Sequence, residues 1–135
     1  MEKTKKTIEL LKRTFPDSSF DLVKEEWISD VENIYPNIPE NLKYLYRNLG
    51  YGTVGDSYYS IHVFLEPSDI YDKETAVGLK GKYIVGDNFC GDCYAYDAEN
   101  NWIFGCINSS GEFNTLSELY ADFVEFLEML AKNEQ

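Results

Sequence analysis

Residues 84–97 read IVGDNFCGDCYAYD, two Gly-Asp pairs followed by an alternating run of tyrosines. Glycine tolerates positive φ, so the pairs permit a sharp turn or a bulge. Side chains alternate across a strand, which places Tyr94 and Tyr96 on one face of a sheet and Cys93 and Ala95 on the other. The stretch therefore predicts a strand, a turn and a second strand, with aspartates gathered at the bend.

Hydrophobic spacing outside this stretch predicts helices at both ends of the chain and strands between them. The expected helices are residues 3–14, 29–35, 39–49 and about 115–130, and the expected strands are 58–65, 83–85, 93–96 and 102–107. Two capping-box patterns set the starts of the second and last helices. Glycine-rich residues 51–56 are expected to form a loop, and residues 108–111 to end the sheet. The predicted fold class is α+β, with a mostly antiparallel central sheet flanked by N- and C-terminal helices.

Size and composition indicate one folded domain over residues 1–135. The chain is 44% hydrophobic and 16% aromatic, which is too apolar for a disordered chain. No apolar run approaches the roughly 20 residues that a membrane helix needs. No apolar segment of signal-peptide length follows the charged N-terminus. We therefore expect no membrane partner, and a cytoplasmic location.

The charge balance limits the classes of partner. The chain has 24 acidic and 12 basic residues, a formal net charge of −12. Such a surface repels nucleic acid and anionic membranes, so direct nucleic-acid binding is not expected. It attracts a basic protein. The same acidity also serves simple solubility, which is the alternative interpretation.

Three ordered segments resemble the SUKH superfamily. Residues 38–52, IPENLKYLYRNLGYG, resemble the family's Leu-Pro, helix and Gly-Gly entry into the sheet. Residues 86–97 resemble its central Gly-Asp and Gly-Asp-x-Tyr-x-Tyr-Asp strand pair, and residues 116–130 its closing helix. The ordered set covers about residues 28–130. The sequence departs from the family pattern at the two cysteines flanking the second Gly-Asp pair and at Leu49-Gly50, where Asn-Gly is commoner.

This resemblance implies a domain without catalytic residues or a cofactor of its own. Bacterial members are mostly immunity proteins that neutralise the toxin domain, often a nuclease, of a secreted polymorphic toxin. Fungal members are regulators of signalling and the cell wall. The small single-domain layout favours the immunity branch, with a basic nuclease domain as partner. A regulatory or scaffold module that binds another protein is the alternative.

Inhibition of a nuclease by an acidic surface predicts carboxylates and aromatic anchors at the contact. The candidate contact residues lie near predicted strand ends and loops: Asp56, Tyr58, Tyr59, Asp87, Asp92, Asp97, Glu99 and Trp102. For Asp87 and Asp92, the alternative role is to cap turns by accepting hydrogen bonds from their own backbone.

Cys90 and Cys93 form a Cys-x-x-Cys pattern, which raises the possibility of a zinc or redox site. Zinc takes about four ligands, and the other soft candidates are only Cys106 and His62. Redox thiols usually open a helix, whereas this pair opens a predicted strand. No nucleophile elbow accompanies the histidine. We therefore expect structural thiols, a structural or surface histidine and no bound metal.

Overall fold

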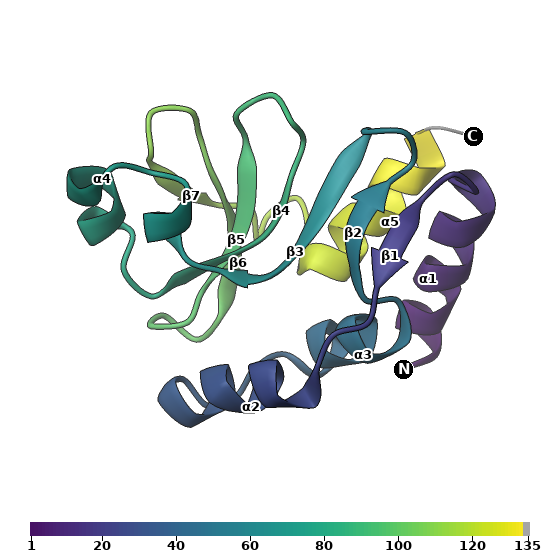
Figure 1. Cartoon of the computed structure of the whole chain (residues 1–135), viewed down its shortest axis with the longest axis horizontal. Helices are drawn as coiled ribbons and strands as arrows, with labels where there is room; N and C mark the ends of the chain where they lie inside the picture. The colour runs from purple at the N-terminus through teal and green to yellow at the C-terminus, as the bar shows by residue number, and fades with distance from the viewer. Residues whose placement is uncertain (134–135) are drawn as a thin grey trace.

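The computed structural model describes residues 1–133, in which helices at both ends of the chain flank one antiparallel sheet (Figure 1). The elements in chain order are α1 (Glu2–Thr14), β1 (Ser19–Asp21), α2 (Glu25–Ile34), α3 (Glu40–Asn48), β2 (Tyr51–Val54), β3 (Tyr59–Leu65), the 3-10 turn η1 (Pro67–Asp69), α4 (Lys73–Gly78), β4 (Lys82–Asp87), β5 (Cys93–Asp97), β6 (Ile103–Ile107), β7 (Phe113–Thr115) and α5 (Phe123–Asn133). The predicted α+β class is confirmed.

The sheet is a meander. Across residues 1–133, seven strands lie in sequence order, and each is antiparallel to the next. Connections in a meander alternate between the two ends of the sheet. Residues 55–58, 88–92 and 108–112 therefore share one end, at the top of Figure 1, while residues 66–81 and 98–102 connect strands at the other.

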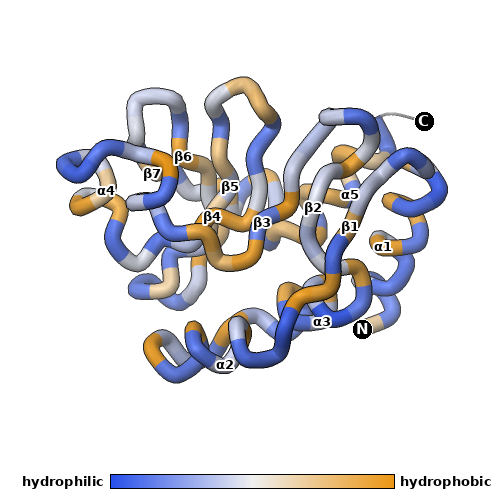
Figure 2. The backbone as a smooth tube through the Cα atoms, in the orientation of Figure 1, coloured by the Kyte–Doolittle hydropathy of each residue, from blue (hydrophilic) through white to orange (hydrophobic). Residues whose placement is uncertain are grey.

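The two faces of the sheet carry different cores. Helices α1, α3 and α5 cover one face, where Leu11, Leu45 and Phe123 are fully buried together with sheet residues such as Tyr96. A smaller cluster on the opposite face joins Cys93, Ala95, Ile84 and Ile107 to Leu79, which follows α4. Figure 2 shows the hydrophobic residues gathered along the central strands. The alternation predicted for residues 93–96 is confirmed.

Residues 84–97 fold as the sequence predicts, with β4 and β5 joined by a turn. The register of β4 against β5 shifts between Ile84 and Gly86, so the first Gly-Asp pair lies at a bulge. A Cβ atom on Gly86 would clash with the hydroxyl oxygen of Tyr59, whose ring is fully buried in the core. Glycine is therefore required at residue 86 by close packing of β3 against β4.

A second irregularity lies in β3. Its register against β4 shifts between Ile61 and Leu65, and Phe64 has a positive φ of 42°. The buried Tyr46 hydroxyl donates to the His62 carbonyl at 2.7 Å and accepts from the Phe64 amide at 3.4 Å. This side chain from α3 thus supplies hydrogen bonds that the irregular strand lacks.

Two predictions in the first half of the chain are wrong. Helix α2 begins at Glu25, so the capping box predicted at residues 29–32 lies inside the helix. Glu25 and Glu26 occupy its first turn, where carboxylates stabilise the positive end of the helix dipole. Residues 51–54 form strand β2 instead of a loop, because β1 supplies an antiparallel partner that the local sequence does not reveal.

Two predictions in the second half are also wrong. The sheet does not end at residues 108–111, because Phe113–Thr115 pairs with β6 as strand β7. The final helix does not begin at the predicted capping box, since Thr115 is still in that strand. Helix α5 begins at Phe123, and the Asp122 carboxylate accepts a hydrogen bond from the Glu125 amide at 2.9 Å.

Candidate protein-interaction surface

Three loops form one end of the sheet, and we call this surface, residues 55–58, 88–92 and 108–112, the hairpin end. It carries Asp56, Asp92 and Glu112 and contains no lysine or arginine. The second and third loops are neighbours, since a Cβ atom on Gly91 would lie 3.7 Å from that of Ser109. The hairpin end therefore gathers acidic residues from separate parts of the chain, and its second and third loops lie side by side.

The second and third loops share one construction. Each begins with asparagine, has glycine in the fourth position and ends with an acidic residue. In residues 88–92, the Asn88 side-chain oxygen accepts from the backbone amides of the third and fifth residues at 2.9 and 3.3 Å. In residues 108–112, Asn108 makes the same two bonds at 2.9 and 3.1 Å. The glycines have φ of 96° and 80°. Internal hydrogen bonds thus order both acidic loops before any partner binds.

Asp87 and Asp92 have different roles. One carboxylate oxygen of Asp87 accepts from the Phe89 amide at 2.9 Å, which confirms the turn-capping alternative for this residue. Its other oxygen lies 2.5 Å from His62 Nε2, so this histidine links β3 to β4. The Asp92 carboxylate accepts from the Asn88 side chain at 3.3 Å. The Asp92 carbonyl also accepts from the Asn88 amide at 3.3 Å, so both the side chain and the backbone of Asp92 close this loop.

Aromatic rings lie among these carboxylates. Tyr58 is 38% exposed and stacks on Phe15, with ring centroids 5.1 Å apart. Phe89 is 53% exposed at the tip of the β4–β5 loop and has a positive φ of 63°. Phe89 is not among the contact residues predicted from the sequence. The sequence feature that indicates its exposure is its position as the single aromatic residue in a turn from Asn to Asp, where a buried side chain is not expected.

Tyr59 and Trp102 were predicted anchors, and the structure corrects both. Tyr59 is fully buried on the helical face of the sheet, with its ring centroid 5.6 Å from that of Phe126. Trp102 is 6% exposed and donates from its indole nitrogen to the Pro36 carbonyl at 3.0 Å. Neither ring is accessible to a partner, because both belong to the main core.

Asp97 and Glu99 lie at the other end of the sheet. Asp97 is 9% exposed, and its carboxylate lies 3.5 Å from the Lys82 ammonium. Glu99 accepts from the Tyr35 hydroxyl at 2.8 Å, a bond that raises the pKa of Tyr35. Three predicted contact residues, Asp56, Tyr58 and Asp92, thus lie in the hairpin end, and Asp87 in β4 directly precedes its second loop. The other four are buried or lie at the opposite end of the sheet.

The cysteines occupy different environments. Cys90 is exposed on the β4–β5 loop, whereas Cys93 is buried on the sheet. Burial raises the pKa of the Cys93 thiol and raises the pKa of Cys106 to about 11. Both of these thiols are therefore protonated near neutral pH. Within residues 1–133, no group of three or more histidine, cysteine or acidic side chains is placed to hold a metal ion.

Comparisons with known proteins add no family to this description. The chain matches no protein-family model, no curated protein and no solved structure. The similarity to the SUKH superfamily therefore stays a prediction that rests on the ordered motifs. Within the part of the chain that the structure describes, no helix has the length and apolar character needed to cross a bilayer.

Proposed function

We propose that this protein is a cytoplasmic immunity protein that binds and neutralises a cognate toxin domain, a nuclease. The observation that carries the proposal is the hairpin end, where three loops present carboxylates, exposed aromatic rings and no cation of their own. The SUKH-like motifs support the same function. The protein acts by binding, with no catalytic step of its own.

Electrostatics explains why such a surface suits a nuclease. A nuclease holds a phosphate backbone in a cleft lined by cations, and the Asp56, Asp92 and Glu112 carboxylates would take the place of the phosphates. The net charge of −12 attracts a basic domain from a distance and speeds encounter. Desolvation of Phe89 and Tyr58 in the contact then slows dissociation.

The order of the loops favours tight binding. A flexible loop loses conformational freedom when a partner fixes it, and this loss opposes association. Residues 88–92 and 108–112 are already fixed by bonds to Asn88 and Asn108. More of the contact energy at the hairpin end therefore remains for affinity.

The test is co-expression with the toxin domain encoded beside this gene. We expect bacterial growth to be rescued and the two proteins to co-purify. The double variant Asp56→Lys/Phe89→Asp should lose protection, because it reverses one charge and removes one anchor at exposed positions. The control Glu26→Lys makes a similar charge change on α2, away from the hairpin end, and should protect as the wild type does.

Two outcomes would reject the proposal. One is that the wild-type protein neither rescues growth nor co-purifies with the toxin domain. The other is that the double variant rescues growth as well as the wild-type protein does, which would place the contact elsewhere. Recovery of a resident signalling or cell-wall protein as the stable partner would instead support the scaffold alternative.

A further inference from the structure

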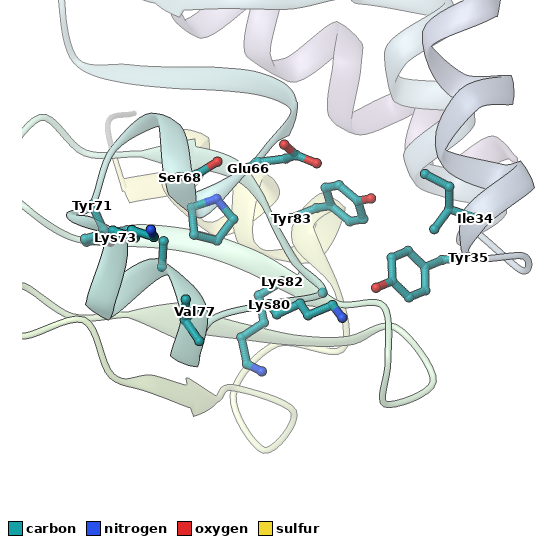
Figure 3. A pocket seen from close by; sticks show the side chains of 13 residues that line it. Ile34, Tyr35, Glu66, Ser68, Tyr71, Lys73, Val77, Lys80, Lys82 and Tyr83 are labelled. Atoms are coloured by element: carbon teal, nitrogen blue, oxygen red, sulfur yellow. The ribbon is translucent and has the colours of Figure 1, made fainter.

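A groove of about 560 Å³ lies at the end of the sheet opposite the hairpin end. Figure 3 shows Ile34 and Tyr35 entering it from the end of α2, Val77 from α4, and Tyr83 with two lysines between them. Its volume is within the range of protein sites that bind an apolar group. The groove shares no residue with the hairpin end, so it is a separate candidate site.

The two rims of the groove, at Ile34 and at Val77, expose aliphatic surface. Ile34 is 66% exposed on one side and Val77 is 71% exposed on the other. Between them, Tyr35 meets Tyr83 edge to face at 5.9 Å, and Tyr83 stacks on the buried Trp102 at 6.0 Å. The aromatic floor is therefore continuous with the main core and rigid. Clustered apolar side chains over such a floor are typical of a contact surface.

The charge of the groove is opposite to that of the molecule. Its lining holds Lys73, Lys80 and Lys82 against the single acidic residue Glu66, a formal sum of +2 in a chain of −12. Lys82 pairs with Asp97. Lys73 and Lys80 are exposed and make no ion pair with any other residue in 1–133. Two cations beside apolar surface thus have no ion-pair partner, while the nearby Asp97 and Glu99 carboxylates are bonded to Lys82 and Tyr35.

We propose that this groove binds a segment of a partner protein in which a large apolar side chain is flanked by carboxylates. The apolar side chain would lie on Tyr83 between Ile34 and Val77, and the carboxylates would reach Lys73 and Lys80. Burial of apolar surface supplies affinity, while the lysines discriminate against basic segments. The two rims belong to separate helices, α2 and α4, which favours an extended segment over a compact small molecule.

The test is selection of a phage library of random twelve-residue peptides on the intact protein. We expect enriched peptides to combine acidic residues with leucine or aromatic residues. A synthetic copy of the best peptide should bind Val77→Asp/Lys80→Glu at least about tenfold more weakly, by fluorescence anisotropy. Val77 and Lys80 are exposed, and a melting curve equal to that of the wild type would verify that the variant folds.

Matched controls separate this groove from other surfaces. Leu119 is 70% exposed, so Leu119→Asp makes the same kind of change as Val77→Asp outside the groove. Lys12→Glu matches Lys80→Glu on exposed α1 surface. Both controls, and Asp56→Lys at the hairpin end, should leave the affinity for the peptide unchanged.

Three results would overturn the inference. They are enrichment of basic peptides, no enrichment at all, and an affinity for the best peptide that the groove variant does not change. The last two would leave a small anionic ligand as the alternative occupant. None of them bears on toxin neutralisation, which is measured by growth rescue and depends on the hairpin end.

Discussion

At the scale of single residues, the buried tyrosines differ in how their hydroxyls are satisfied. The Tyr59 hydroxyl is buried and has no hydrogen-bond partner within residues 1–133, whereas Tyr46 bonds the backbone of β3. We expect Tyr59→Phe to leave the free energy of unfolding unchanged or raise it by about 1 kcal/mol, since it removes an unpaired polar group. Tyr46→Phe should lower the free energy of unfolding by about 1–3 kcal/mol, since the His62 carbonyl would lose its hydrogen-bond donor. Urea denaturation measures both, and the reverse ranking would contradict this account.

The three thiols should differ sharply in reactivity. Cys90 is exposed, while Cys93 is buried and Cys106 is half-buried with its pKa raised to about 11. We expect a disulfide reagent at pH 8 to label one thiol quickly in the native protein and all three after unfolding. Cys90→Ser should abolish the fast phase. Rapid labelling of two thiols, or zinc bound to the purified protein, would revive the thiol or zinc alternative.

The Cys106 thiol should affect the stability of the fold at alkaline pH. Burial raises the pKa of Cys106 in the folded state from an ordinary value of 9.0 to about 11. A raised pKa favours folding while the thiol is protonated in both states. This contribution is therefore complete below about pH 9 and is lost as the pH rises toward 11. We expect melting temperatures to fall over this interval, and to fall less in Cys106→Ala; an equal fall in both would refute the assignment to this thiol.

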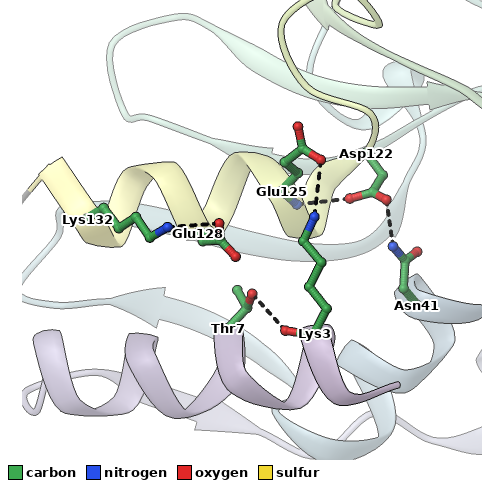
Figure 4. A network of polar contacts seen from close by, with 7 residues as sticks. All are labelled: Lys3, Thr7, Asn41, Asp122, Glu125, Glu128 and Lys132. Atoms are coloured by element: carbon green, nitrogen blue, oxygen red, sulfur yellow. Dashed lines mark hydrogen bonds and ion pairs between the residues drawn. The ribbon is translucent and has the colours of Figure 1, made fainter.

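At the scale of elements, the start of α5 depends on Asp122. Figure 4 shows its carboxylate between the Glu125 amide and the Asn41 side chain of α3, at 2.9 and 2.7 Å. We expect Asp122→Ala to lower the free energy of unfolding by about 1–2 kcal/mol, because it removes a helix cap and a link between helices. Glu118→Ala, in the capping box that the sequence predicted, should change it by less than about 0.5 kcal/mol. Equal losses would favour the earlier helix start.

The elements that the sequence predicts correctly carry their own signal. The apolar stripe of α3 and the alternation of β5 are periodic within a few residues. Strands β2 and β7 lack such a pattern and become strands because β1 and β6 pair with them. The predicted start of helix α5 is too early for a related reason: Leu116 extends a helical stripe, but its amide donates to the Phe104 carbonyl of β6. Long-range partners, which local sequence does not encode, decide these boundaries.

The residues of the candidate surface also differ in whether local sequence predicts their position. Asp56 and Asp92 lie in turns that the sequence indicates, and a meander brings alternate turns to one end. The burial of Tyr59 and Trp102 depends on α5 and on the Pro36 carbonyl, which are distant in sequence. The local sequence around an aromatic residue near a predicted strand end does not show whether that residue is exposed to a partner or buried in the core. Exposure of Phe89 likewise follows from the shape of its loop.

At the scale of the whole molecule, charge is unevenly distributed. The hairpin end holds carboxylates and no cation, while the groove at the other end sums to +2. The loops at that other end, residues 66–81 and 98–102, hold five acidic residues and two lysines, so the excess of cations is local to the groove. A basic partner is attracted by the net charge of the whole molecule, and the hairpin end, which has carboxylates and no cation, suits it better than the groove does.

Salt should therefore act mainly on association with the toxin domain. Added ions screen exposed charges beyond about 10 Å at 0.1 M, so steering weakens while contacts already formed are less affected. We expect the association rate constant, measured by stopped flow, to fall about tenfold or more between 0.05 and 0.5 M NaCl, with a smaller change in the dissociation rate. Asp56→Lys should lower the rate at low salt and flatten its salt dependence, whereas Glu26→Lys should do so much less. An association rate independent of salt would exclude steering by the hairpin end, even if the complex forms, and would leave its aromatic contacts as the source of affinity.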